Sequence, residues 1–383
     1  MFSLPNPGRI SANGRVPDWF RISNESEVPS PSLLLFPDRI EENIRRMIAL
    51  AGGADRLRPH VKTHKLPQVL QMQLRQGIHK FKAATIAESE MCAAAGAPDV
   101  LLAYPVVGPN IQRLVALVQR FPQTQFRAVG DDWNSLRELG ATAQAAGLRI
   151  EVLLDLNVGM NRTGIQPGEA AFQLYRNLAS TPGLLAGGLH AYDGHLHQKE
   201  RSQRESALGD AFAPVWELQE RLLAAGIPVP RIVASGTPTF PLLAQRADLE
   251  LGAGTTVLWD FGQAETCPDM HFLEAAVLLT RVISRPTPQR LTLDLGHKAV
   301  ASEMLPPRVR FFGLEEATFV MHSEEHLVIE TPRAVEYPVG TAVYGIPRHV
   351  CPTVALHSEV HVVRSGAVQE SWPVVARARR ITI

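Results

Sequence analysis

The stretch Ser32-Leu33-Leu34-Leu35-Phe36 is a short apolar run that begins the pattern on which the fold depends. Such a run is typical of a buried strand, and the Pro37-Asp38 pair that follows it favours the start of a helix. The apolar residues of this helix share one face, namely Ile40, Ile44, Met47 and Ile48. The sequence therefore predicts a strand followed by an amphipathic helix.

The same alternation of strand and helix continues to about residue 270. Further apolar runs predict strands from Leu57 to Val61, Phe81 to Ile86, Val100 to Tyr104, Phe126 to Val129, Ile150 to Asp155, Leu184 to Ala191, Arg231 to Ser235 and Leu249 to Gly252. Regular alternation favours a parallel sheet in an α/β protein. Nine candidate strands suit a (β/α)8 TIM-like barrel with one strand outside it. An open doubly wound sheet is the alternative.

Beyond residue 270 the pattern changes to β-rich segments separated by Pro and Gly turns, without long amphipathic helices. These segments predict a C-terminal all-β domain. We therefore expect three parts: an N-terminal segment over 1–30 that packs on the β domain, a barrel over 31–270, and the β domain over 271–383.

The composition is that of an ordinary globular protein, with 45% hydrophobic residues and a formal net charge of zero. The absence of a basic excess argues against nucleic acid or an anionic membrane as a partner. No apolar run reaches the roughly 20 residues that a transmembrane helix needs, and no signal peptide is visible. Three cysteines favour a reducing cytoplasm over a disulfide framework.

The segment Arg58-Pro59-His60-Val61-Lys62-Thr63-His64-Lys65 follows a predicted strand and carries a candidate nucleophile. Residues at the C-terminal ends of barrel strands face the active site. There, with His60 and His64 nearby, the ammonium form of Lys62 could be disfavoured and its amine could act as a nucleophile. The alternative is a surface lysine in a basic turn.

Two Gly-containing turns could supply backbone N–H donors to a phosphate. They are Ser235-Gly236-Thr237 and Gly252-Ala253-Gly254-Thr255-Thr256, and each follows a predicted strand. Either alone would be an ordinary turn, but two such turns at neighbouring strand ends would hold one phosphate between them.

The tripeptide His349-Val350-Cys351 places an imidazole and a thiol two residues apart, on the same side of an extended backbone. The pair could bind zinc or another divalent metal, although two ligands do not complete a metal shell. A half-buried histidine beside an unreactive core cysteine is the alternative.

The Lys62 segment resembles the pyridoxal-phosphate lysine motif of the D-threonine aldolase and D-serine dehydratase family, a branch of the alanine racemase-like, fold type III enzymes. Residues 151–164 resemble the family's strand and D-x-x-x-G-x-x-R-x-G loop, and residues 189–195 resemble the next strand end. The resemblance implies that Lys62 forms a Schiff base with pyridoxal 5'-phosphate (PLP). Arg162 and Tyr192 would contact this cofactor, and His60 lies in the same motif.

The resemblance also implies a lyase that acts on β-hydroxy-D-amino acids with a divalent metal at His349 and Cys351. Zinc is favoured by the thiolate, with magnesium or manganese as alternatives. His195 and His197 are candidate bases. Retro-aldol cleavage to glycine and an aldehyde is favoured over dehydration to a 2-oxo acid and ammonia. Racemisation and a non-catalytic PLP-binding role remain as alternatives. A homodimer is implied, and no residue is assigned to the pyridine nitrogen.

Overall fold

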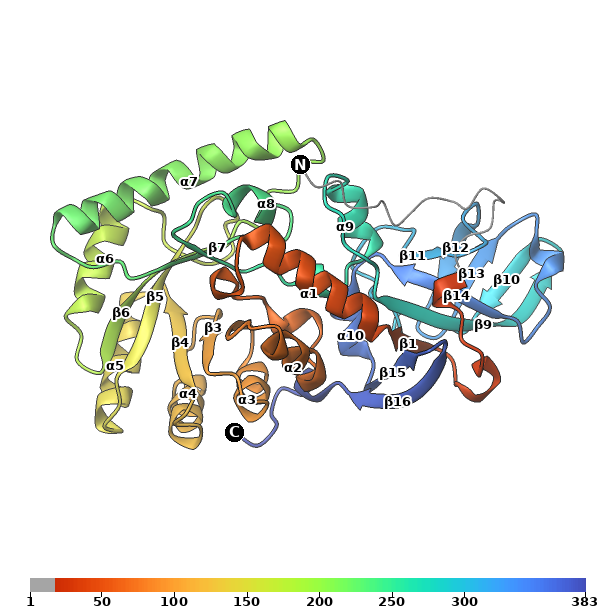
Figure 1. The fold of residues 1–383 in the computed structure, drawn as a ribbon, viewed down its shortest axis with the longest axis horizontal. Helices are drawn as coiled ribbons and strands as arrows, with labels where there is room; N and C mark the ends of the chain where they lie inside the picture. The colour runs from red at the N-terminus through yellow and green to blue at the C-terminus, as the bar shows by residue number, and fades with distance from the viewer. Residues whose placement is uncertain (1–17) are drawn as a thin grey trace. The chain divides into compact units, whose positions relative to one another are not determined.

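The structure is a computed structural model that describes residues 18–383, and the chain divides into two compact units (Figure 1). The barrel unit comprises Ile44–Gly254 with Ala378–Ile383, and the sheet unit comprises, of the described residues, 18–43 with Thr255–Arg377. Helix α1 (Pro37–Ala51) runs across the boundary. The part of the N-terminal segment over 1–17 that was expected to pack on the β domain lies outside the described residues.

The barrel unit contains a curled sheet of seven parallel strands, in the order β2-β3-β4-β5-β6-β7-β8. The strands are β2 (Lys80–Ala83), β3 (Asp99–Leu102), β4 (Gln125–Gly130), β5 (Ile150–Leu156), β6 (Leu184–Ala191), β7 (Ile232–Ala234) and β8 (Leu249–Leu251). The helices are α2 (Pro67–Arg75), α3 (Ile86–Ala94), α4 (Pro109–Arg120), α5 (Trp133–Ala145), α6 (Glu169–Ala179), α7 (Arg201–Ala224) and α8 (Phe240–Leu243). The TIM-like class predicted from the alternation is confirmed.

The predicted strand from Leu57 to Val61 is not a strand. Leu57 forms an isolated parallel bridge to Leu251, and His60 forms one to Lys82. The N–H of Arg58 donates to the carbonyl of Leu251, and the N–H of Lys82 donates to the carbonyl of Pro59, both at 2.9 Å. This segment thus connects the two edge strands of the sheet, but Pro59 lacks an N–H and cannot join a continuous ladder.

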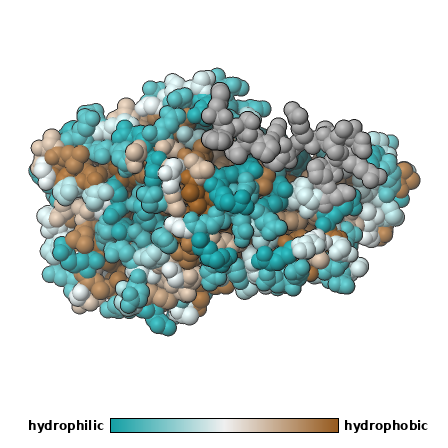
Figure 2. Space-filling view, viewed as in Figure 1, coloured by the Kyte–Doolittle hydropathy of each residue, from teal (hydrophilic) through white to brown (hydrophobic). Residues whose placement is uncertain are grey.

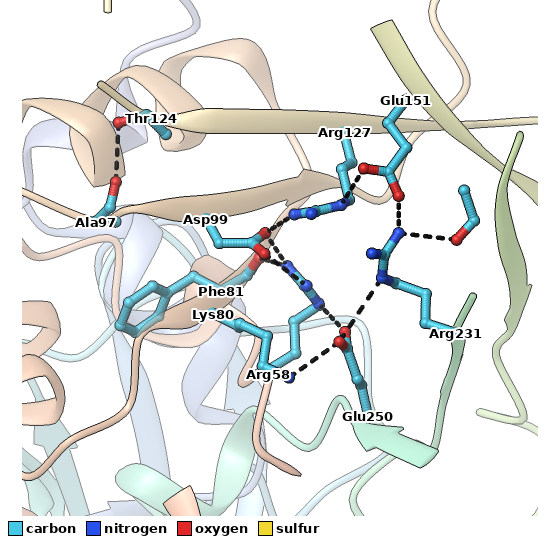
Figure 3. A network of polar contacts seen from close by, with 11 residues as sticks. Arg58, Lys80, Phe81, Ala97, Asp99, Thr124, Arg127, Glu151, Arg231 and Glu250 are labelled. Carbon is cyan, nitrogen blue, oxygen red and sulfur yellow. Dashed lines mark hydrogen bonds and ion pairs between the residues drawn. The ribbon is translucent and has the colours of Figure 1, made fainter. Parts of the chain in front are cut away.

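The barrel interior is layered because side chains of a strand alternate between its two faces. A charged layer lies at the strand starts, and Figure 3 shows how its side chains converge. Its members are Arg58, Lys80, Asp99, Arg127, Glu151, Arg231 and Glu250. Two residues further along four of these strands, a hydrophobic cluster fills the middle, formed by Leu101, Val129, Leu153 and Val233.

Arg58 lies at the centre of the charged layer and its side chain is fully buried. It donates at 2.6 Å to both Asp99 and Glu250. Glu250 also accepts from Lys80 Nζ at 3.0 Å, and Arg127 Nε donates to Glu151 at 3.0 Å. Buried cations are tolerated when each has an opposite charge and its hydrogen bonds are satisfied. This layer therefore contributes to the stability of the barrel rather than to ligand binding.

The sheet unit is built on nine strands, most of them antiparallel, with the order β12-β13-β10-β9-β1-β15-β16 and with β14 joining β11 to β9. The strands are β1 (Ser32–Leu35), β9 (Ala276–Thr287), β10 (Arg290–Leu293), β11 (Val309–Phe311), β12 (Thr318–His322), β13 (Leu327–Glu330), β14 (Ala342–Pro347), β15 (Glu359–Arg364) and β16 (Ala367–Pro373). Two short helices, α9 (Phe261–Thr266) and α10 (Val350–Leu356), complete it.

Strand β1, which opened the β/α pattern, lies in this sheet and not in the barrel. It pairs antiparallel with β9 and parallel with β15. All four of its residues are buried, as the apolar run predicted. Phe20, Ile22 and Val28 join Leu34 in one hydrophobic cluster of the sheet unit. Because both faces of β1 are buried, apolar and polar residues do not alternate along this strand.

The surface of both units mixes hydrophilic and hydrophobic residues, as Figure 2 shows for one face. None of the helices within residues 18–383 combines the length and the apolar character that crossing a bilayer requires.

Candidate active site

Lys62 lies in a short 3-10 helix, Val61–Thr63, that directly follows the barrel-closing segment. His60 precedes this helix as its N-cap, and its Nδ1 accepts a hydrogen bond from the Lys62 N–H at 3.3 Å. Burial, with the nearby charge of Lys62, lowers the pKa of His60 well below its usual value. His60 is therefore a neutral acceptor that shapes the turn carrying Lys62.

Three cationic side chains of the barrel unit converge on the ring of Tyr192. The Lys62 Nζ lies 5.4 Å from the ring centroid, the Lys82 Nζ lies 5.6 Å from it, and the guanidinium of Arg162 lies 4.8 Å from it. The cations come from the segment after Leu57, from β2 and from the loop after β5. Tyr192 follows β6, so the barrel brings together residues that are 130 positions apart in the sequence.

The loop that carries Arg162 is held by its own hydrogen bonds. The Asn157 side chain accepts from the N–H groups of Gly159 and Asn161, both at 3.0 Å. Gly164 has a φ of +96°, and a Cβ there would lie 2.5 Å from the Asn157 nitrogen. Only glycine fits this position, which gives a physical reason for the last glycine of the D-x-x-x-G-x-x-R-x-G pattern.

A buried carboxylate and histidine lie at the top of β5 and β6. Asp155 and His190 Nδ1 are 2.6 Å apart, and both side chains are at most 6% exposed. Burial raises the pKa of Asp155, but the hydrogen bond and charge of His190 outweigh it, so this pKa lies below its usual value. The His190 Nε2 is buried without a partner. Sequence reasoning missed this pair.

The two Gly turns follow β7 and β8, as predicted. Ser235 is fully buried with a φ of +78°, and the Gly236 N–H donates to Asp193 at 2.5 Å. The Gly252 N–H donates to the Ala234 carbonyl at 2.8 Å. These two N–H groups therefore already have acceptors within the protein. A phosphate at these turns would need other donors from the Thr237 and Gly254 side of each turn.

The two candidate bases differ in their surroundings. His195 is half-buried, and its Nδ1 is a buried atom without a hydrogen-bond partner. Its Nε2 lies 2.8 Å from the position that a Cβ of Gly159 would take, so His195 packs on the Arg162 loop. His197 is exposed. The structure thus places His195, and not His197, beside the loop that carries Arg162.

The metal-ligand candidates lie in the sheet unit. The expected extended backbone is found only at His349, which is the N-cap of α10, whereas Cys351 lies in the first turn of that helix. Their side chains still interact: burial lowers the pKa of His349, but Cys351, Asp260 and Glu303 raise it to about 9. Thr255, expected at the phosphate, has its hydroxyl oxygen 3.7 Å from the Cys351 Sγ.

Two carboxylates support this pair. The Glu303 Oε1 lies 2.5 Å from the His349 Nδ1. Asp260 is buried and accepts the Val350 N–H at 2.9 Å, which fixes the start of α10. Burial raises the pKa of Asp260 to about 6. A carboxylate on one ring nitrogen of a histidine orients the other nitrogen for a metal. Neither carboxylate was found from the sequence.

The donor set fits a divalent metal with open positions. Imidazole and thiolate are zinc-type ligands, and the contact of His349 with Glu303 leaves its Nε2 as the coordinating atom. Among the described residues, no group of three His, Cys, Asp or Glu side chains forms a ready-made metal site.

The barrel residues likewise fit an anionic aldehyde cofactor. Lys62 offers an amine and Arg162 offers a fixed cation. A small cavity is lined by Arg162 but not by Lys62, and its other lining residues are Asp155, Leu156, Asn157, Met160, Thr163 and Tyr192. A larger cavity of about 190 Å³ lies elsewhere in the barrel unit, between the loops after β2 and β3. None of the predicted site residues lines the larger cavity.

Comparison with known proteins agrees with this fold. The family described as "Alanine racemase, N-terminal domain" matches residues 37–253, and "Putative serine dehydratase domain" matches residues 275–363. The chain belongs to the alanine racemase-like, fold type III family of PLP enzymes. Within it, the chain is an enzyme of the PLP-dependent lyase class, to which its curated relatives belong.

The relatives are similar over nearly their whole length. A D-threonine aldolase of Arthrobacter sp. is 30% identical over 92% of this chain and 93% of its own. A 3-hydroxy-D-aspartate aldolase of Paracoccus denitrificans is 29% identical over 93% of this chain and 94% of its own. The crystal structure of a D-threonine aldolase from Filomicrobium marinum has a TM-score of 0.86 and 28% identity, covering 92% of this chain and 96% of that one.

Proposed function

We propose that this lyase cleaves β-hydroxy-D-amino acids by a retro-aldol reaction, giving glycine and an aldehyde. The observation that carries the proposal is the convergence of the Lys62 amine and the Arg162 guanidinium on Tyr192. The two curated relatives given above are both aldolases, which favours cleavage over dehydration.

In this proposal Lys62 would hold PLP covalently, and PLP would supply an acceptor for the electrons released at the substrate α-carbon. Arg162 would fix the orientation of the cofactor through a cation on a rigid loop. His349 and Cys351 would hold a divalent metal, which would supply a Lewis acid for the β-hydroxyl group of the substrate. His195 would accept the proton of that hydroxyl, since it lies beside the loop that carries Arg162.

The second candidate is dehydration to a 2-oxo acid and ammonia. The thiol of Cys351 favours it, because the His-x-Cys pair resembles dehydratase members of the family more than aldolase members. A D-threo-3-hydroxyaspartate dehydratase of Delftia sp. is 24% identical over 90% of this chain. Here Lys62 would remove the α-proton, and the metal would assist the departure of hydroxide.

One assay separates the two reactions. Purified enzyme is incubated with D-threonine, D-serine and D-threo-3-hydroxyaspartate, and both glycine and 2-oxo acid are measured. Glycine as the main product supports the aldolase, and 2-oxo acid with ammonia supports the dehydratase. The L-isomers serve as controls for the proposed configuration. Racemised substrate as the sole product would refute both.

The metal requirement is tested by chelation. We expect a chelator to remove activity and leave the visible absorption band of the bound cofactor unchanged. His349→Ala and Cys351→Ala should bind metal at least about 10-fold more weakly. His326→Ala is the matched control, since His326 is an exposed histidine of the same unit. Activity that survives both chelation and Cys351→Ala would exclude the metal role.

Assembly and location are also proposals. We expect a homodimer, as the family resemblance implies, which light scattering of the purified protein would test. None of the three cysteines, all within residues 18–383, forms a disulfide, and two of them are buried. Cysteines without disulfides favour a cytoplasmic protein. The formal net charge of zero favours a small-molecule partner over nucleic acid or membrane.

A further inference from the structure

Lys82 is a buried amine that the proposed mechanism does not use. It lies in β2 and is 1% exposed, with its side chain inside the barrel. Its bridge to His60 places it two residues below Lys62, in the middle layer of the interior. At this level the other strands contribute apolar side chains, including Leu101 and Val129.

Lys80 shows what a merely structural lysine of this strand looks like. Two residues before Lys82 on the same face, its Nζ forms an ion pair with Glu250 at 3.0 Å. For Lys82, no ion pair is found within residues 18–383. A buried lysine without such a partner is costly, and a ligand that accepts a hydrogen bond from its amine would offset this cost.

The ionisable groups around Lys82 include both cations and carboxylates. The closing segment contributes Arg58, His60 and Lys62, β5 contributes Asp155, β6 contributes His190, and Asp193 follows β6. Burial, followed by the charge of Lys62, lowers the pKa of Lys82 to about 7. At neutral pH this amine therefore exchanges its proton readily.

The Lys82 amine lies directly against β8. A Cβ at Gly252 would lie 2.3 Å from the Lys82 Nζ and 3.2 Å from the Ala234 carbonyl oxygen. Gly252 begins one of the two turns expected at the cofactor phosphate, and Ala234 directly precedes the other. The amine therefore lies close to the first residue of one turn and to the residue before the other. Like the amine of Lys62, it also lies near the ring of Tyr192.

We propose that Lys82 contacts the ring nitrogen of PLP, donating a hydrogen bond to it from the barrel interior. The inference rests on the proposed role of Lys62. Lys62 would hold the carbon that lies across the pyridine ring from this nitrogen, and the two turns would hold the phosphate. A ring fixed at these two points directs its nitrogen away from Lys62, toward the layer that contains Lys82. Lys82 would then be a cofactor-positioning residue that also sets how strongly the ring attracts electrons.

The test measures cofactor binding to the apo-protein, with no turnover. Affinities for PLP and for its 1-deaza analogue, which lacks the ring nitrogen, are compared by fluorescence titration. Wild type should bind PLP about 10- to 100-fold more tightly than the analogue, the range for a hydrogen bond to a charged group. Lys82→Met should lose this preference, and Lys82→Gln, which keeps an N–H donor, should retain part of it.

Lys80→Met is the matched control, because it removes the same functional group from the same strand and face. It should keep the full preference for PLP. A preference unchanged in Lys82→Met, or an equal loss of affinity for both ligands, would overturn the inference. If circular dichroism shows that Lys82→Met is unfolded, Lys82→Gln replaces it. A partial loss of the preference for PLP in Lys82→Gln would then support the inference, and a full preference or an equal loss of affinity for both ligands would overturn it. Folded wild-type apo-protein that binds neither ligand would instead contradict the proposed function.

Discussion

Both ends of the barrel interior carry cations, but the cations differ in their partners. At the strand starts, Arg58 and Lys80 contact the carboxylates of Asp99 and Glu250, so nearly all charge is paired. At the strand ends, Lys62 and Arg162 converge on a neutral tyrosine ring. Paired charges stabilise a fold, whereas cations gathered without matching anions are suited to an anionic ligand.

The greatest effect is expected at the strand ends. Lys62→Ala should abolish the visible absorption band of the cofactor and reduce activity by at least about 1,000-fold, because Lys62 is the proposed Schiff-base lysine. Absorption spectra and glycine release measure the two effects. Lys199→Ala, which changes an exposed lysine of the same unit, should alter neither. A persistent band in Lys62→Ala would mean that the cofactor lysine lies elsewhere.

Substitutions in the charged layer should lower the stability of the protein and not its cofactor binding. Arg58→Met removes the central cation and leaves Asp99 and Glu250 partly unpaired, which should lower the free energy of unfolding by about 3 kcal/mol. The urea unfolding midpoint measures this loss. The exposed pair Arg333–Glu336 gives the control, because Arg333→Met should cost less than about 1 kcal/mol. Equal losses of unfolding free energy in the two variants would show that the buried ion pairs contribute no more to stability than an exposed pair does.

Lys82 should make the stability of the apo-protein depend on pH. Its pKa is about 7 when folded, below the usual value of 10.5. Between these two pH values the unfolded chain binds more protons, so the stability should rise with pH from about 7 to about 10. The gain should be a few kcal/mol at most. In Lys82→Met, thermal unfolding should show a smaller increase of stability with pH. An increase as large as that of the wild type would show that other groups cause it.

The smallest effect should come from Lys80→Met. Lys80 is 26% exposed on its side chain, and Glu250 keeps Arg58 as a partner when Lys80 is removed. The loss of stability should therefore stay below about 1 kcal/mol, within the range of surface ion pairs. Chemical denaturation measures it. A loss as large as that of Arg58→Met would show that every charge of the layer is needed.

The hydrophobic pattern predicted most of this fold because strand and helix periods are local properties. Seven predicted strands of the alternating region are strands of the barrel, from Phe81 onward. The segment from Leu57 failed because Pro59 interrupts its pairing, and β1 pairs in the other sheet. An apolar run shows that a strand is buried but not which sheet buries it.

The charged layer could have been predicted from the sequence, although it was not. Each of its members stands at or next to the start of a predicted strand, such as Asp99 before Val100 and Glu151 after Ile150. Charges repeated at this position in a barrel predict an interior network, since the strand starts meet at one end. Lys82 could likewise have been predicted as a buried charge, because it is the one charged residue in the apolar run from Phe81 to Ile86.

The sequence by itself determined the strand and helix pattern, the Lys62 motif and the His349–Cys351 pair, because these depend on neighbours within a few residues. Only the tertiary structure decided that Arg162 and Tyr192 lie beside Lys62, that Glu303 contacts His349, and that Lys82 is buried near Gly252. These contacts join residues from 30 to 170 positions apart. Their formation depends on barrel closure and sheet pairing, which bring distant segments together in ways that no local pattern encodes.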